Sequence, residues 1–161
     1  MLRTSLLPLA ALLAAAVPCE ALDLTGTWVG KQTCRGFDGE NFSFKLSEST
    51  VEIVQTGNDV ALQVLTDAEP DVYRGVAIDS VGNTDQGGVY IVHCGTSDVP
   101  GSGIDNFDET GILSAKTKSN GSGKLKGASQ YFNTAPEFAG CRWSYKRIST
   151  TPPVVGSCQV M

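Results

Sequence analysis

The chain has 161 residues and a formal net charge of −5 at pH 7, with 41% hydrophobic and 18% charged residues. About 140 residues remain beyond an apolar N-terminal segment, which is enough for one domain with its own core. None of their apolar stretches reaches the roughly 20 residues of a membrane-spanning helix, so we expect no transmembrane segment.

The first 21 residues have the pattern of a signal peptide. Arg3 supplies the positive charge, residues 6–17 form the apolar core, and Cys19-Glu20-Ala21 places small residues three and one before a cut. We therefore expect cleavage after Ala21 and an exported, periplasmic or secreted protein. Acylation of Cys19 is the alternative, although Pro18 stands where a small residue is expected.

Cleavage would leave four cysteines: Cys34, Cys94, Cys141 and Cys158. An even number in an exported chain predicts two disulfides, for which the sequence allows three pairings. The cysteines lack the close spacing of zinc ligands, and we expect neither a metal nor another cofactor.

From Leu24 onward, apolar residues alternate with polar ones, which is the period of a half-buried strand. Gly57-Asn58-Asp59 predicts a tight turn, and Asn120-Gly121 predicts a hairpin with a type I′ turn. Longer loops are expected at residues 35–40, 79–88, 95–108 and 133–140. The apolar runs lie near residues 24–34, 42–46, 51–55, 60–64, 74–78, 89–94, 112–118, 124–132 and 141–148.

This order favours an all-β fold, an antiparallel up-and-down β-barrel of eight or nine strands over residues 22–149. Pro152 and Pro153 exclude residues 150–161 from an inner strand, because proline lacks the ladder donor. We expect a disulfide from Cys158 to attach this tail to the barrel.

The first and last strands carry the only two tryptophans, each on a strand with a cysteine. If Cys34 lies opposite Cys141 in an antiparallel pair, Trp28 falls opposite Arg147 on the same face. An arginine over an indole ring stabilises a fold by roughly 0.5–2 kcal/mol. Pairing these two strands would close the sheet into a barrel.

Gly26-Thr27-Trp28 on the first strand, with Arg147 late on the last, resembles the lipocalin or calycin group. In that group the tryptophan closes the barrel floor, a basic residue packs across it, and the barrel binds small, mostly apolar ligands. The resemblance implies that Trp28 and Arg147 close the barrel. Residues 34–39 and 141–147 also resemble segments of small exported bacterial proteins, which implies no activity.

We expect the barrel interior to bind a small apolar or amphipathic ligand through Phe42, Phe44, Trp143 and Tyr145. No motif predicts an enzyme, since the sequence has one histidine, His93, and no G-x-S-x-G elbow. His93 is interpreted as an ordinary residue at a strand end. Asp105, Asp108 and Glu109 are interpreted as solvated loop acids, with calcium binding as the alternative.

Charge is unevenly distributed along the chain. Residues 22–109 contain 15 acids and 4 bases, whereas residues 110–161 contain 7 bases and 1 acid. We interpret this as opposite charges on neighbouring strands, with a basic patch for an anionic partner as the alternative. No aromatic residue separates the outward-facing lysines of the Asn120 hairpin, so we expect no nucleic-acid binding; these lysines are Lys116, Lys118, Lys124 and Lys126.

Two other functions remain alternatives to a ligand-binding barrel. One is a structural or interaction protein of the cell envelope or extracellular space. The other is an inhibitor of a secreted enzyme, which would present the loop at residues 95–108. The sequence indicates no oligomeric state.

Overall fold

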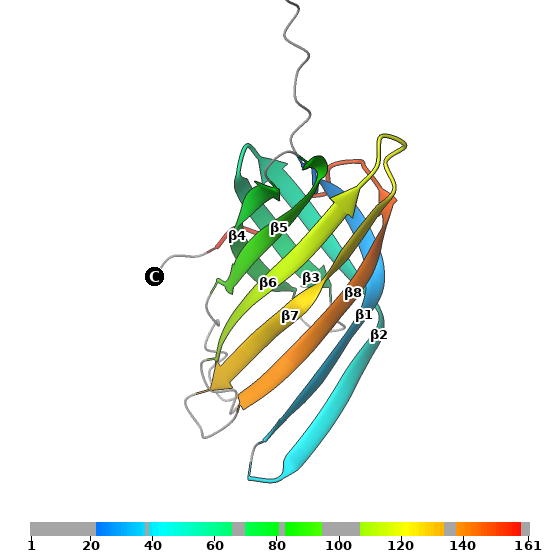
Figure 1. Cartoon of the computed structure of the whole chain (residues 1–161). Helices are drawn as coiled ribbons and strands as arrows, with labels where there is room; N and C mark the ends of the chain where they lie inside the picture. The colour runs from blue at the N-terminus through cyan, green and yellow to red at the C-terminus, as the bar shows by residue number, and fades with distance from the viewer. Residues whose placement is uncertain are drawn as a thin grey trace, which may run out of the picture.

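The fold is a closed barrel of eight antiparallel strands (Figure 1). The computed structural model describes residues 22–37, 39–65, 70–80, 83–94, 107–133 and 138–158. The predicted signal peptide lies outside these residues. The strands are β1 (Gly26–Phe37), β2 (Asn41–Thr56), β3 (Asp59–Leu65), β4 (Asp71–Ser80), β5 (Asn83–His93), β6 (Phe107–Thr117), β7 (Gly123–Asn133) and β8 (Phe138–Ser149).

Each strand pairs with the next, and β8 pairs with β1. This confirms the predicted all-β, up-and-down barrel. In the closing pair, Cys34 lies opposite Cys141 and Trp28 lies opposite Arg147. The described part of the chain contains no helix with the length and hydropathy needed to cross a bilayer.

β2 is one strand where the apolar pattern indicated two. The apolar residues of 42–46 have even numbers and those of 51–53 have odd numbers, so strict alternation would turn one set outward. Ser47 and Ser49 pair with consecutive residues of β1, which leaves Glu48 as an extra residue with a φ of 66°. This β-bulge moves the alternation by one position, so that Leu46 faces inward as Val51 and Ile53 do.

Several local expectations need correction. All four longer loops are shorter than predicted, because a strand extends into each of them: β1 continues to Phe37, β5 begins at Asn83, β6 begins at Phe107 and β8 begins at Phe138. The Asn120-Gly121 hairpin forms, but Asn120 lacks the positive φ of a type I′ turn. Its side chain instead accepts a hydrogen bond from the Ser122 N–H at 3.1 Å, while Gly121 takes the positive φ of 82°.

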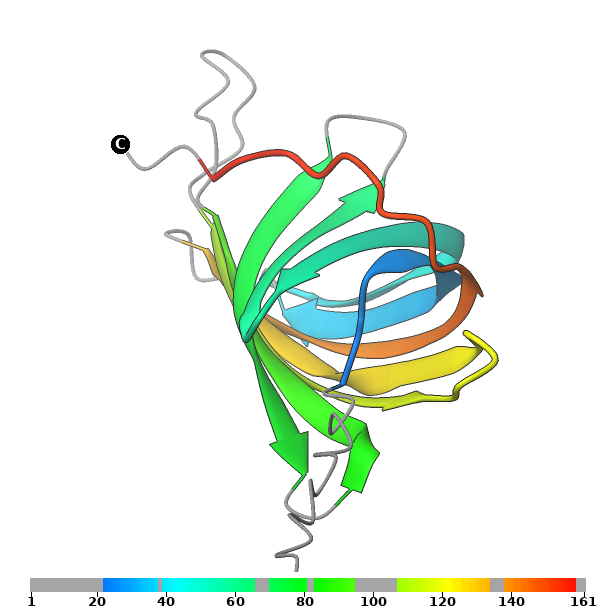
Figure 2. The ribbon, with the colours of Figure 1, turned by 90° about the horizontal axis from the view of Figure 1, so that it is seen from above.

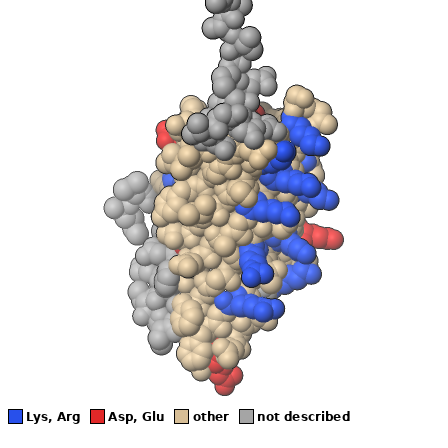
Figure 3. All heavy atoms as spheres, in the orientation of Figure 1, with Lys and Arg blue, Asp and Glu red and all other residues tan. Residues whose placement is uncertain are grey.

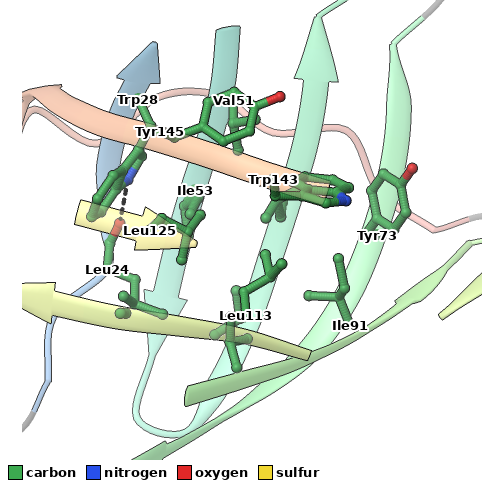
Figure 4. Packing of buried hydrophobic residues seen from close by; sticks show 14 of the residues in the cluster. Leu24, Trp28, Val51, Ile53, Tyr73, Ile91, Leu113, Leu125, Trp143 and Tyr145 are labelled. Carbon is green, nitrogen blue, oxygen red and sulfur yellow. Dashed lines mark hydrogen bonds between the residues drawn. The ribbon is translucent and has the colours of Figure 1, made fainter. Parts of the chain in front are cut away.

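Inward-facing side chains fill the barrel with a hydrophobic core (Figure 4). Aliphatic residues from β2, β3, β5, β6 and β7 belong to this core together with Trp28 and Tyr145. The largest fully buried side chains include Trp28, Tyr73, Tyr145, Leu22, Leu24, Ile53, Leu62, Ile91, Leu113 and Leu125. The hydrophobic core therefore extends along the barrel from Trp28 to Tyr73 (Figure 4).

The segment before β1 crosses the end of the barrel where β1 begins (Figure 2). Leu22 and Leu24 on this segment are 1% and 0% exposed. The Gln55 amide holds the segment, since it donates to the Leu22 carbonyl at 2.8 Å and accepts from the Leu24 N–H at 3.0 Å. The Trp28 Nε1–H donates to the Leu24 carbonyl at 3.0 Å, so the tryptophan also anchors it.

Arg147 covers the same end from β8. Its guanidinium carbon lies 5.2 Å from the Trp28 ring centroid, which is a cation–π contact. The guanidinium also donates to the carbonyls of Asp23 at 2.8 Å, Thr25 at 3.3 Å and Gly121 at 2.7 Å. Arg147 therefore joins the N-terminal segment, the β6–β7 hairpin and the tryptophan.

Two disulfides, as predicted, join distant parts of the chain. Cys34–Cys141 links β1 to β8, and Cys94–Cys158 links the end of β5 to the C-terminal tail. The tail also binds the outward-facing amide of Gln63 on β3, which accepts from the Gly156 N–H at 2.9 Å.

Candidate functional site

A buried carboxyl group, Glu109, lies inside the barrel toward the end opposite Trp28. Glu109 is near the start of β6 and is 5% exposed. It belongs to the same alternation as Gly111 and Leu113, which are both buried. Its interpretation as a solvated loop acid is therefore wrong. Counting back in steps of two from Leu113 would have placed it inside the barrel.

Two hydroxyl groups orient this carboxylate. The Tyr73 hydroxyl donates to Oε2 of Glu109 at 2.7 Å, and the Ser129 hydroxyl donates to Oε1. The Trp143 Nε1–H in turn donates to Oγ of Ser129 at 2.8 Å. We call Glu109, Tyr73, Ser129 and Trp143 the Glu109 cluster; its members come from β6, β4, β7 and β8.

Aromatic rings pack around the cluster. The Tyr73 ring meets the Trp143 ring edge to face, with centroids 5.9 Å apart and planes at 85° (Figure 4). His93, half-buried at the end of β5, meets Tyr73 in a similar way at 5.0 Å and 79°. The strand-end position predicted for His93 is correct, and its ring belongs to the wall beside the cluster.

The electrostatic environment of the cluster disfavours negative charge. Burial raises the pKa of Glu109, although the hydrogen bonds from Ser129 and Tyr73 act in the opposite direction. Asp71 is an inward-facing residue at the start of β4. Burial and then the charge of Glu109 raise the pKa of Asp71 from 3.8 to about 6. Burial, followed by the charge of Glu109, also raises the pKa of the Tyr73 hydroxyl.

Among the described strands, the basic side chain that faces inward at this end is His93, which packs against Tyr73. The only Lys or Arg on an inward position of these strands is Arg147, which lies at the other end over Trp28. The two carboxyl groups thus share a region that holds no Lys or Arg of the described strands. Such a region attracts a proton or a ligand with positive charge.

The four residues that were predicted to contact a ligand do not form one site. Trp143 and Tyr145 face inward and are 2% and 1% exposed. The Tyr145 hydroxyl lies 2.6 Å from Oγ of Ser49, so its polar group is satisfied within the core. Phe42 is half-buried near the start of β2. Phe44 lies opposite Cys34 in the backbone, and its side chain is outside the described part.

Sequence reasoning missed Tyr73, Asp71 and Ser129 as site residues. They lie far apart in the chain and have no spacing motif. No group of three His, Cys, Asp or Glu side chains that could hold a metal ion occurs among the described residues. The arrangement is suited to binding, since an oriented carboxylate beside aromatic faces can receive an ammonium group.

Comparisons of the chain with protein families, with curated proteins and with solved structures found no match. A proposal for its function therefore rests on its own geometry and chemistry.

Proposed function

We propose that this protein binds a small amphipathic molecule inside the barrel and holds a positively charged group of that molecule on Glu109. One observation carries the proposal: a carboxyl group that is 5% exposed is hydrogen-bonded through both oxygens, and no Lys or Arg of the described strands faces inward at its end of the barrel. The ligand class is a primary or substituted amine with an apolar body.

The cost of burying charge supports this ligand class. An uncompensated buried ion loses several kcal/mol of solvation, and a cation close to it recovers part of that loss. In the free protein a proton can neutralise Glu109, because its pKa is raised. A bound ammonium group would replace that proton and would also contact the aromatic faces of Tyr73 and Trp143.

Asp71 supplies a second carboxyl group to the same ligand. It faces inward at the start of β4 and is half-buried, whereas Glu109 is deeply buried. A ligand that approaches from this end would meet Asp71 first and Glu109 afterwards. The pair therefore favours cations over neutral and anionic molecules of the same size.

The chain's likeness to lipocalins is consistent with a binding role. Gly26-Thr27-Trp28 and Arg147 close one end of the barrel, so the proposed site lies toward the other. The two disulfides are compatible with an oxidising compartment outside the cytosol. We propose a non-enzymatic, exported protein, released by cleavage after Ala21.

Calorimetric titration with three molecules of equal chain length tests the proposal. Decylamine, decanol and decanoate are each added below their micelle-forming concentrations at about pH 8, which is above the pKa of about 6 of Asp71 and leaves the amine protonated. We expect decylamine to bind at least about tenfold more tightly than decanol, and decanoate to bind most weakly. Equal binding of the three molecules would contradict the proposal.

Glu109→Gln keeps the size of the side chain and removes its charge. We expect it to weaken decylamine binding by about tenfold or more and to leave decanol binding unchanged. Glu52→Gln is the matched control, because Glu52 faces outward on β2 and contacts Gln63 at 2.6 Å. The proposal fails if the two variants bind decylamine equally well.

A further inference from the structure

The outer surface of β6, β7, β8 and β1 carries a group of basic side chains. Figure 3 shows lysines and arginines gathered in a band along this side of the barrel. No Asp or Glu occurs in residues 110–116, 124–130, 140–146 or 29–35 of these strands. We call the seven exposed cations of these segments the basic face: Lys116, Lys124, Lys126, Arg142, Lys146, Lys31 and Arg35.

Strand pairing brings these cations side by side. Lys124 lies opposite Lys116 on one neighbouring strand and opposite Lys146 on the other. The interpretation that neighbouring strands carry opposite charges is therefore wrong for this surface. Closure of the barrel adds Lys31 and Arg35, which lie opposite Ser144 and Gly140 of β8.

The basic face has the dimensions of several sugar units. Four strands spaced about 4.8 Å apart span about 15 Å, and three steps of two residues along a strand span about 20 Å. Seven positive charges within this area create a strong local potential. Because the whole chain has a net charge of −5, this attraction is confined to the basic face.

Two hollows adjoin the basic face. One, of about 580 Å³, lies against β4, β5, β6 and β7, and Lys116, Lys124 and Lys126 line it beside Ile78. The other, of about 430 Å³, is lined by Arg35 and Arg142. At Gly140 in the second hollow, an added Cβ would meet no atom within 4 Å. Cations thus line both hollows, and the rest of the basic face connects them.

We infer that the basic face binds a linear acidic polysaccharide, whose carboxylates contact the cations and whose sugar rings rest in the two hollows. Repeated negative groups on an extended chain match a track of cations that runs between two hollows. The outward positions of the four segments hold no aromatic residue, which disfavours the base stacking of single-stranded nucleic acid. Only Val29 and Ile112 are large apolar residues there, which disfavours insertion into a membrane.

Binding to polygalacturonate, a linear polymer of carboxylated sugars, tests this inference. Biolayer interferometry with immobilised polymer would measure the dissociation constant over a series of salt concentrations, with neutral dextran as the reference. We expect binding to polygalacturonate that weakens steeply with salt, because the contacts are ionic, and no binding to dextran. Absence of polygalacturonate binding at low salt would overturn the inference.

Paired substitutions locate the surface. Lys126→Gln with Arg142→Gln removes one cation from the lining of each hollow, and we expect affinity to fall by about tenfold or more. Arg74→Gln removes a cation from an exposed position of β4, outside the basic face, and affinity should stay within about twofold. Equal losses of affinity in both variants would refute the placement of the polysaccharide on the basic face.

Glu48→Gln tests the same surface in the opposite direction. Glu48 is exposed on the β2 bulge, next to the Ser47 that pairs with Lys31. Removing this acid should strengthen polygalacturonate binding by about twofold to fivefold. If single-stranded DNA or vesicles of anionic phospholipid bind more tightly than polygalacturonate and respond to the same paired substitutions, the assignment to a polysaccharide is wrong.

Discussion

The two inward-facing carboxyl groups, Asp71 and Glu109, predict an unusual dependence of stability on pH. Asp71 gives the clearest test. Burial and the charge of Glu109 raise the pKa of Asp71 from 3.8 to about 6. An acid with a higher pKa in the folded than in the unfolded state binds its proton more tightly when the protein is folded. Its contribution to stability is therefore complete below about pH 4 and is lost as the pH rises through about 6.

The size of this effect follows from the shift. About two pKa units correspond to about 3 kcal/mol in the free energy of unfolding. Asp71 is only half-buried, so solvent screening reduces this value. We expect the parent protein to lose about 1–2 kcal/mol between about pH 4 and pH 7 through this residue.

Asp71→Asn removes the titrating group and keeps the shape of the side chain. The variant should match the parent near pH 4 and exceed its stability by about 1–2 kcal/mol near pH 7. Urea unfolding at several pH values measures the difference, under non-reducing conditions that preserve both disulfides, with the near-ultraviolet circular dichroism of the buried aromatic residues as the signal.

Asp59→Asn is the control, because Asp59 is exposed at the start of β3. This variant should lose stability with rising pH just as the parent does. The reasoning about Asp71 is refuted if Asp71→Asn also keeps the parent's full loss of stability between pH 4 and pH 7.

Three further predictions concern closure of the barrel, and urea unfolding checks each. Arg147→Met removes the contact with Trp28 and the hydrogen bonds to three carbonyls, and should cost about 2–3 kcal/mol; an unchanged midpoint would contradict the closing role. Gly30→Ala should cost about 2 kcal/mol or more, because its Cβ would lie 2.1 Å from the Ser144 carbonyl oxygen, whereas Gly140→Ala should be tolerated; equal effects would contradict this packing. Replacing Cys34 and Cys141 together by Ala should cost about 2–5 kcal/mol, because their disulfide joins residues 107 positions apart; a loss below about 1 kcal/mol would contradict its contribution.

The fold followed closely from the sequence, because alternation of apolar and polar residues is a local property of a strand. The register that places Cys34 opposite Cys141 also places Trp28 opposite Arg147, and both pairs occur in the structure. The single extra residue at Glu48 was not visible in this pattern. A bulge depends on which residue of the partner strand lies opposite each position, and alternation along one strand does not show this pairing. The two apolar runs of different parity were therefore interpreted as two strands.

The candidate site was predicted only in part. Trp143 was placed inside the barrel from its alternation with Cys141 and Tyr145, and it is buried there. Glu109 was interpreted as a loop residue because it follows other acids in the sequence. Its buried position depends on where β6 begins and on which face of β6 points inward.

The sequence by itself determined most of the strands, their up-and-down order and the pattern that closes the sheet, since these depend on period-two alternation, turn residues and cysteine positions. Only the tertiary structure decided that Tyr73 and Ser129, 56 residues apart in the chain, donate to one carboxylate. Closure likewise brought the cations of β1 beside those of β8. The physical reason is that cross-strand neighbours in a closed barrel are set by register and closure, which join residues that local sequence patterns cannot relate.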